Sequence, residues 1–329
     1  MADLVLHIGA HKTGTSYIQR RLFRNRDQLA RKGIFYPDIG PNPAHHVLTA
    51  KWIPNAAFDA SLRQTGGIEA LWNQVISDHA ERDGTLFLSG EPFSRLAPQQ
   101  VDFAELATML SRFSSVRIIY VARHQVELIQ SIWQEVLKSG HLPNLRAFLK
   151  HALEAGLASG VPVDHAMVLD HLAKGFSKDQ ITVLDYQTAR QHSGGILQAL
   201  MDAAGLLPDT RDLAEPAENT INSAPPALTQ WLATKITAPR PANPKILEAI
   251  DALLVTRHGQ KKSTIFTPSQ IAAIRKGFAE RNETFVARVQ ETQPDFKLTA
   301  DGFATENLIT PKQLDTRFGL DLCEAMIRL

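Results

Sequence analysis

The stretch Leu4-Val-Leu-His-Ile-Gly-Ala-His-Lys-Thr-Gly-Thr-Ser-Tyr-Ile18 decides the fold of this chain. It begins as a short apolar run, which is typical of a strand buried on both faces of a parallel sheet. The run breaks at Gly9, and a helical spacing of apolar residues starts at about Thr15 and continues through Ile18 and Leu22. The sequence therefore predicts a strand, a tight loop and a helix in direct succession.

The loop between this strand and this helix has the composition of an anion-binding site. Gly9 and Gly14 permit unusual dihedral angles and a close approach to the backbone. Hydroxyl groups and the free N–H groups of a helix start face the same way, and a lysine adds a mobile positive charge. The candidate binding residues are Lys12, Thr13, Gly14, Thr15 and Ser16. We expect a phosphorylated or sulfated molecule to bind here.

The order of residues in this loop separates it from the Walker P-loop. That motif places its lysine after the second glycine, whereas Lys12 precedes Gly14. The order Lys-Thr-Gly-Thr-Ser instead resembles the 5′-phosphosulfate-binding loop of sulfotransferases that use 3′-phosphoadenosine 5′-phosphosulfate (PAPS). The alternative interpretation is a glycine-rich turn whose lysine is merely solvated.

The composition and the net charge indicate which broad classes of protein fit this chain. An apolar content of 44% and a charged content of 21% are ordinary for a water-soluble protein of 329 residues. The net charge of +1 argues against a general nucleic-acid binder. The charge is uneven, because residues 1–32 carry seven lysines and arginines against Asp3 and Asp27. A basic helix behind an anion loop suits a multiply charged nucleotide, although it is equally explained as a solvated helix face.

The cysteine content and the hydropathy of the sequence lead to an expectation about where in the cell the protein is found. Cys323 is the only cysteine, which excludes intrachain disulfides and cysteine-based metal sites. The sequence shows neither a signal-peptide pattern nor an apolar run of the roughly 18 residues that a membrane-spanning helix needs. We therefore expect a cytoplasmic protein without a transmembrane segment, similar to soluble bacterial sulfotransferases.

Strand and helix patterns alternate along the first two thirds of the chain. Further strands are predicted at 33–37, 85–89, 116–122 and 180–184, and helices at 45–52, 68–80, 98–113, 124–138, 145–155, 164–175 and 195–204. This alternation predicts a three-layer α/β fold: a P-loop-like parallel sheet, joined by right-handed crossovers and flanked by helices. Helices at 227–237, 244–255 and 268–290 then predict a helical C-terminal part. We expect one domain over 1–329, with its α/β core in 1–205 and the helical part in 206–329.

Two further strand ends carry polar chemistry. Ligands bind beyond the carboxyl ends of parallel strands, where this chain places Ser89-Gly-Glu91 and Arg123. Ser131 follows Arg123 by eight residues on the next predicted helix. The pair resembles the 3′-phosphate-binding signature of the PAPS sulfotransferases, and Ser89-Gly-Glu91 resembles the Ser-Glu segment of their carbohydrate-type members. Taken without the resemblance, the arginine pairs with a carboxylate and the serine has no role.

The resemblance implies transfer of a sulfuryl group from PAPS to a hydroxyl or amine of an acceptor, with release of 3′,5′-ADP. Lys12 would stabilise the leaving oxygen, residues 13–16 would hold the 5′-phosphate, and Arg123 and Ser131 would select the 3′-phosphate. No metal is implied. The acceptor, expected to be a carbohydrate or a lipid-linked saccharide, would contact the loops 38–66 and 208–226. The resemblance also implies that Lys261 and Lys262 belong to a nucleotide-binding loop near the C-terminal end.

A base must take the acceptor's proton, and four residues are candidates. Glu91 is our first choice, because it follows a predicted strand end and matches the glutamate of the carbohydrate-type enzymes. His45 and His46 have suitable side chains and are expected on the acceptor side, where either shares the task. His124 is more simply a helix cap.

Two other classes of function stay open at this stage. A P-loop-type kinase or nucleotide hydrolase with a degenerate phosphate loop would need Mg²⁺, with Glu91 as its acidic ligand. A non-catalytic protein that holds PAPS or a sulfated glycan would use the same loop without turnover. A metal enzyme is less well supported, because the histidines show no familiar ligand spacing.

Overall fold

The computed structural model describes residues 1–206, 208–216, 225–303 and 308–327. The chain forms two compact units. The first unit contains Met1–Arg123, Gly160–Ile221 and Arg281–Thr299, and the second contains His124–Ser159, Asn222–Glu280 and Ala300–Leu329. The expected single domain, with its core in 1–205 and a helical part in 206–329, stays a prediction.

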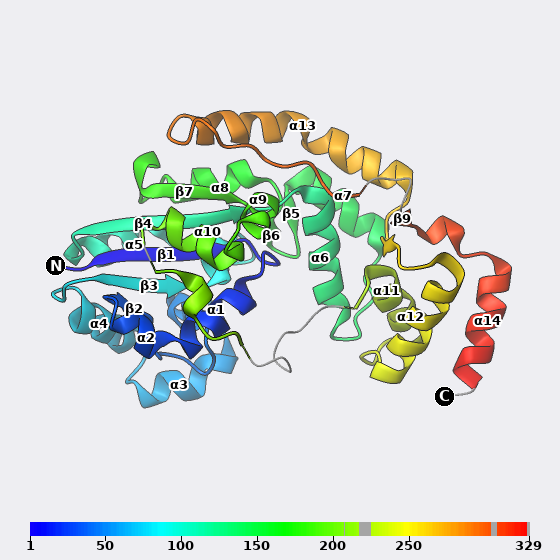
Figure 1. Ribbon diagram of the computed structural model, residues 1–329, viewed down its shortest axis with the longest axis horizontal. Helices are drawn as coiled ribbons and strands as arrows, with labels where there is room; N and C mark the ends of the chain where they lie inside the picture. Colours follow the sequence, from blue (N-terminus) through cyan, green and yellow to red (C-terminus); the bar gives the residue numbers. More distant parts are fainter. Residues whose placement is uncertain (207, 217–224, 304–307, 328–329) are drawn as a thin grey trace. The chain divides into compact units, whose positions relative to one another are not determined.

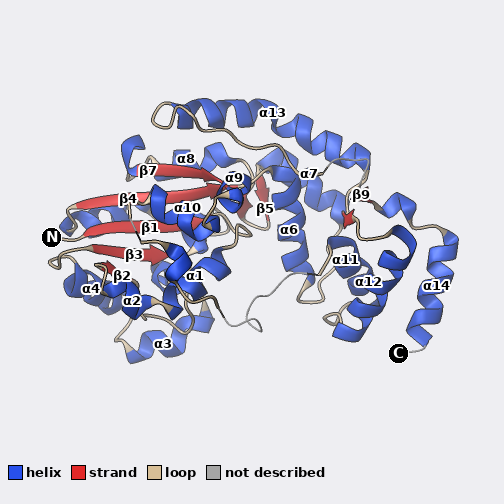
Figure 2. Ribbon diagram, in the orientation of Figure 1, coloured by secondary structure: helices blue, strands red, loops and turns tan. Residues whose placement is uncertain are grey.

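A five-stranded parallel sheet forms the centre of the first unit (Figures 1 and 2). Its strands, in spatial order, are β2 (Ile34–Phe35), β3 (Thr85–Ser89), β1 (Asp3–Gly9), β4 (Ser115–Ala122) and β7 (Ile181–Asp185). The parallel α/β class predicted from the alternating pattern is thus confirmed. The strand order runs outward from β1 in both directions, to β3 on one side and to β4 on the other. Open α/β sheets bind their ligands at such a reversal of strand order.

Helices cover both faces of this sheet, which gives the predicted three layers. Along β1, Leu4, Leu6 and Ile8 pack into one apolar cluster and Val5 packs into another, as the two-residue period of a strand requires. The first cluster includes residues of α4 (Ile68–His79), α5 (Phe103–Met109), α8 (His165–Leu172) and the end of α13 (Pro268–Gln290). The second includes residues of α1 (Thr15–Arg24), α2 (Arg26–Ala30), α9 (Tyr186–Gln191) and α10 (Gly195–Ala203).

Short elements complete the first unit. They are α3 (Asp59–Gln64), β6 (Val161–Pro162) and the 3₁₀ helices η1 (His46–Lys51), η2 (Ala56–Phe58), η3 (Glu91–Ser94), η4 (Leu110–Arg112), η5 (Lys178–Gln180) and η6 (Thr210–Asp212). One of them, η1, replaces a longer helix that was predicted, and a second correction concerns α5. The helix expected at 45–52 is the 3₁₀ helix η1. The helix expected from residue 98 begins at Phe103, because the side chain of Asp102 caps it by accepting from the N–H of Glu105 (3.0 Å).

The second unit is mainly helical. Its elements are α6 (Gln125–Leu137), α7 (Leu145–Ala155), α11 (Ala227–Thr237), α12 (Pro244–His258), α14 (Thr316–Ile327), the first half of α13, η9 (Pro311–Gln313), β5 (Leu157–Ala158) and a two-stranded parallel sheet of β8 (Lys262–Ser263) and β9 (Leu308–Ile309). Side-chain amides join its helices, since Gln134 and Gln230 bond to each other at 3.4 Å.

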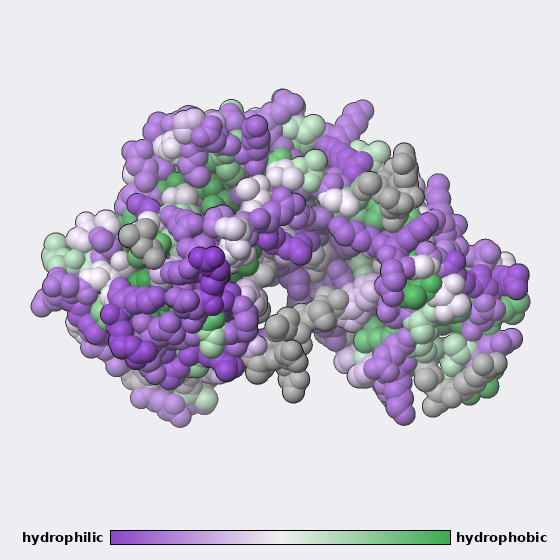
Figure 3. Space-filling model, viewed as in Figure 1, coloured by the Kyte–Doolittle hydropathy of each residue, from purple (hydrophilic) through white to green (hydrophobic). Residues whose placement is uncertain are grey.

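The surface of the chain is mostly polar on the face that Figure 3 shows. No helix among the described residues is long and apolar enough to cross a membrane.

Candidate functional site

The predicted loop follows β1 directly and its backbone is shaped by two glycines. Gly9 has a φ of 66°, and a Cβ placed on it would lie 3.0 Å from the Thr15 side chain and 3.1 Å from the Cβ of Glu91. Only glycine fits this close approach, which brings the end of β1 against the start of α1 and against the residue after β3. Gly14, with a φ of 79°, occupies the N-cap of α1.

The N-terminus of α1 presents backbone donors. No side chain caps the helix, and the hydroxyl of Thr13 is directed back to the carbonyl of Ala10 at 2.6 Å. Within the described part of the chain, the N–H groups of residues 13–16 have no acceptor. Unpaired N–H groups at a helix start carry partial positive charge and favour an anion.

Lys12 holds an uncommon backbone conformation in this loop. Its φ of 67° lies in the left-handed region, which costs a non-glycine residue of order 1–3 kcal/mol and persists only where neighbours enforce it. Arg123 supplies one such constraint, because its Nη1 donates to the carbonyl of Lys12 at 2.7 Å. Residues from two strand ends therefore fix one loop.

Arg123 is itself held from two sides. Its guanidinium lies 4.7 Å from the ring centroid of Tyr186, the first residue of α9, which is a cation–π distance. The carbonyl of Arg123 accepts from Nε2 of His165 (2.9 Å), and Nδ1 of His165 is 2.7 Å from the hydroxyl of Tyr120. Because His165 donates through Nε2, its Nδ1 accepts from that hydroxyl, which defines the tautomer.

Glu91 lies at the carboxyl end of β3, and its orientation is fixed by two donors. Its Oε2 accepts from Nε2 of His46 at 2.7 Å and from the side-chain amide of Gln19 at 3.0 Å. Burial favours the neutral acid, but the hydrogen bond and charge of His46, with smaller effects of His11 and Gln19, outweigh it and hold the pKa of Glu91 well below its usual range. Its Oε1 has no partner among the described residues.

The two adjacent histidines differ in environment. His45 is 1% exposed, and both of its ring nitrogens are engaged: Nε2 donates to the carbonyl of Pro37 and Nδ1 accepts from the N–H of Ser89, each at 2.9 Å. His45 therefore anchors its loop to β3, and burial lowers its pKa to about 4. The His46 side chain is 24% exposed and contacts Glu91. Of the pair, His46 is the one placed for acid–base chemistry.

Two further histidines lie near Glu91. His7, in the middle of β1, is fully buried, and its Nδ1 is 2.9 Å from the hydroxyl of Ser89. His11 lies in the loop beside Lys12. Burial lowers the pKa of both imidazoles to about 4, and the negative charge of Glu91 opposes this shift. Both are neutral at pH 7.

Ser131 and His124 belong to the second unit, so the predicted pairing of Ser131 with Arg123 on one phosphate stays a prediction. Ser131 is half-buried on α6. His124 is the N-cap of that helix, with Nδ1 accepting from the N–H of Val126 at 3.4 Å and lying 3.5 Å from Asp301. This is the capping role that the sequence favoured for it. Part of the predicted acceptor loop 208–226, residues 217–224, lies outside the described residues.

Sequence reasoning missed Gln19, Tyr186 and His11. Gln19 lies one helical turn after Thr15 in α1 and contacts Glu91 at the end of β3. Its spacing from Thr15 was the sequence feature that could have indicated this place in the site. Tyr186 directly follows β7, the last strand of the sheet. Because ligands bind beyond the carboxyl ends of parallel strands, this position was a signal for Tyr186 as it was for Arg123. No group of three or more metal-ligating side chains in a suitable arrangement occurs among the described residues.

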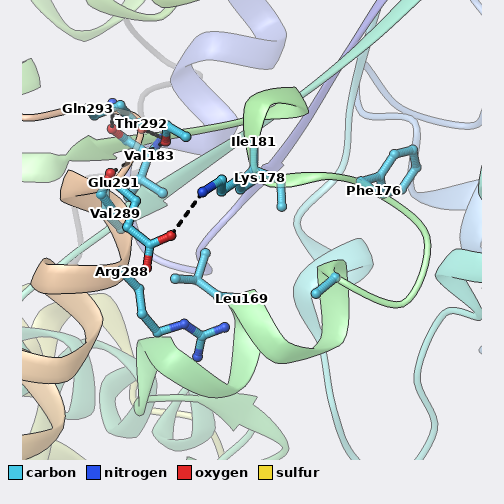
Figure 4. A pocket seen from close by; sticks show the side chains of 11 residues that line it. Leu169, Phe176, Lys178, Ile181, Val183, Arg288, Val289, Glu291, Thr292 and Gln293 are labelled. Carbon is cyan, nitrogen blue, oxygen red and sulfur yellow. Dashed lines mark hydrogen bonds and ion pairs between the residues drawn. The ribbon is translucent and has the colours of Figure 1, made fainter.

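A pocket of about 220 Å³ lies in another part of the first unit, between α8, β7 and the end of α13 (Figure 4). Its wall combines apolar side chains, among them Leu169, Ile181 and Val183, with polar ones. Lys178 and Glu291, which also line it, form an ion pair at 3.2 Å. None of the predicted site residues lines it.

No protein-family model matches the chain, and no curated protein matches it in sequence. Several solved structures have a similar arrangement. A sulfotransferase from Alicyclobacillus acidocaldarius is 12% identical, with 89% of this chain and 96% of that chain covered and a TM-score of 0.48. A mouse sulfotransferase complexed with PAP is 12% identical (90% and 89% covered, TM-score 0.42). Retinol dehydratase, in complex with androsterone and the inactive cofactor PAP, is 13% identical (85% and 80% covered, TM-score 0.40). Likenesses this distant assign no activity or substrate to the chain.

Proposed function

We propose that this protein is a PAPS-dependent sulfotransferase that transfers a sulfuryl group to a hydroxyl or amine of a carbohydrate or glycolipid acceptor. One observation carries the proposal: the N–H groups of residues 13–16, which bond to no other described residue, lie beside Lys12 in a loop that Arg123 braces. The arrangement supports binding of a phosphosulfate, and the residue order in the loop resembles that of enzymes that use PAPS.

In the proposed reaction the acceptor oxygen or nitrogen attacks sulfur while the bond from sulfur to the 5′-phosphate oxygen breaks. The acceptor's proton passes to a base, and 3′,5′-ADP leaves with the electron pair of the broken bond. Charge develops on the bridging and equatorial oxygens, much as in phosphoryl transfer. Lys12 and the N–H groups of residues 13–16 would stabilise that charge from fixed positions.

Nucleotide selection is assigned to Arg123 and Ser131. An arginine has five N–H donors in a planar fork that matches phosphate. One donor of Arg123 holds Lys12, and the stacking on Tyr186 orients the rest. Tyr186 also lies 4.0 Å from a Cβ placed on Gly14, so its ring borders the loop and adds an aromatic wall to the proposed nucleotide site.

The base is assigned to Glu91, with His46 as its partner. Gln19 and His46 both bind Oε2, which leaves Oε1 to approach the acceptor. The lowered pKa makes Glu91 a carboxylate at neutral pH, although it weakens its basicity. His46 shares the proton, because its Nε2 is 2.7 Å from the carboxylate.

The test is a turnover assay with PAPS and a panel of saccharide acceptors, in which released 3′,5′-ADP is measured chromatographically. We expect release that depends on the acceptor and survives EDTA. Lys12→Ala should lower kcat more than it weakens PAPS binding, because the lysine acts on charge that develops in the transition state. Lys150→Ala, at an exposed position of α7, is the matched control.

Phosphoryl transfer from ATP that requires Mg²⁺ would contradict the proposal and favour the kinase. PAPS binding without turnover on any acceptor would instead favour the non-catalytic binding protein.

A further inference from the structure

His11 is half-buried, and its Nε2 atom is not used for hydrogen bonding within the described part of the chain. This Nε2 is itself shielded from solvent, although the residue as a whole is half-buried. The neighbouring His45 and His46 behave differently, because each bonds through its ring. Leaving a buried polar group unpaired is unfavourable, so a structural role alone gives His11 no advantage over an apolar residue of the same size.

The position of His11 places this unused group beside the chemistry. It precedes Lys12 in the loop, and its imidazole is within electrostatic reach of Glu91, Arg95, His46 and Lys12. His11 is therefore near both Lys12, which is assigned to the leaving group, and Glu91 and His46, which are assigned to the base. In the proposed reaction the sulfuryl group moves from the leaving group near Lys12 to the acceptor near Glu91.

We propose that Nε2 of His11 donates a hydrogen bond to a sulfuryl oxygen of PAPS and holds the sulfuryl group for transfer. This inference rests on the proposed function, since it assigns the sulfuryl subsite of the same site. The sulfuryl group has oxygens that need donors once Lys12 and the backbone have taken the phosphate side. A neutral imidazole supplies one N–H donor without adding a second cation beside the Lys12 ammonium.

The state of the ring agrees with this role. Burial lowers the pKa of His11 to about 4, so the imidazole is uncharged at pH 7 and carries one N–H. Because Nε2 has no partner among the described residues, the ligand sets whether this nitrogen carries the proton. A fixed donor aimed at a developing anionic oxygen is worth most in a site from which water is excluded.

The experiment compares PAPS with 3′,5′-ADP, which lacks the sulfuryl group. Isothermal titration of both ligands is carried out with the wild-type chain, His11→Phe, which keeps a planar ring without N–H, and His11→Gln, which keeps a donor. His151→Phe, at an exposed position on α7, is the matched control. We expect His11→Phe to weaken PAPS binding by tenfold or more, on the order expected for a bond to a charged oxygen, and to leave 3′,5′-ADP binding unchanged. His11→Gln should recover part of the loss.

Equal PAPS affinity and equal kcat in wild type and His11→Phe would overturn this inference and leave the proposed function intact. If the wild type bound neither PAPS nor 3′,5′-ADP, the proposed function would fail and the inference with it.

A measurement that needs no apolar variant is the ¹⁵N spectrum of labelled histidine, with His11 assigned through His11→Gln. Its Nε2 signal should shift on addition of PAPS and stay in place with 3′,5′-ADP. An unchanged signal with PAPS would also overturn the inference.

Discussion

Replacement of Glu91 by glutamine tests the acid–base assignment with little change in shape. The amide oxygen can accept from His46 and Gln19 as Oε2 does, so the contacts at 2.7 and 3.0 Å are retained while the proton acceptor is lost. A positioned general base contributes ~10²–10⁴ in rate, which corresponds to about 3–5 kcal/mol of activation free energy. We expect kcat to fall by that factor and PAPS affinity to stay within about threefold, since Glu91 is assigned to the acceptor side.

The effect on stability should be smaller than the effect on rate. Glu91→Gln turns two charge-assisted hydrogen bonds into neutral ones, and the side chain is only 13% exposed. We expect a loss of about 1–2 kcal/mol in the free energy of unfolding, measured by urea denaturation. Steady-state kinetics with released 3′,5′-ADP as the signal give kcat, and titration gives PAPS affinity. Glu154→Gln on the exposed face of α7 is the control for a carboxylate-to-amide change.

The pH dependence separates Glu91 from His46 as the base. A base loses activity as the pH falls through its pKa, and the pKa of Glu91 lies well below its ordinary value. If Glu91 is the base, kcat/KM should stay level as the pH falls from 7 to about 5. If Glu91→Gln retains near-full turnover while His46→Asn reduces it a hundredfold, Glu91 is not the base and the role belongs to His46.

Two other predictions concern the residues that support the site. His7 and His45 are buried and neutral, with pKa values of about 4. In the unfolded chain these histidines bind protons near pH 6.5, so the free energy of unfolding should fall as the pH drops from about 6.5 to 4, by roughly 3 kcal/mol per histidine. Urea denaturation at several pH values should show this slope. An unchanged midpoint over this range would contradict the assigned burial. Gly9→Ala should cost about 1–3 kcal/mol, because φ is 66° and the added Cβ meets Thr15 and Glu91. It should also reduce kcat. Gly319→Ala, at an exposed position of α14 where an added Cβ meets no atom within 4 Å, should lower neither stability nor kcat, because alanine favours a helix more than glycine does.

The sequence was sufficient for the sheet and for the loop, and physical reasons explain why. Short apolar runs bounded by glycine and polar residues predicted all five strands of the main sheet, since β-strands buried on both faces leave a simple pattern. The loop after β1 was recognisable because glycines, hydroxyls and a lysine occur there together.

Contacts between distant segments left no comparable pattern. Nothing in the local sequence indicated that Gln19 and His46 would meet on Glu91, because they come from three separate elements. The same holds for the brace from Arg123 to the carbonyl of Lys12, which is a contact to backbone and carries no residue signature. His45 and His46 looked equivalent in sequence, and only burial distinguishes the anchoring histidine from the one beside Glu91.

The central claim is that the site around Lys12 and Arg123 binds a nucleotide with a 3′-phosphate. Isothermal titration of 3′,5′-ADP against 5′-AMP tests it directly, with the wild type and Arg123→Ala measured side by side. Losing one charged partner of a bound phosphate costs about 2–5 kcal/mol. We predict that the wild type binds 3′,5′-ADP at least tenfold more tightly than 5′-AMP, and that Arg123→Ala removes most of this difference. Equal affinity of the wild type for the two nucleotides would contradict the account.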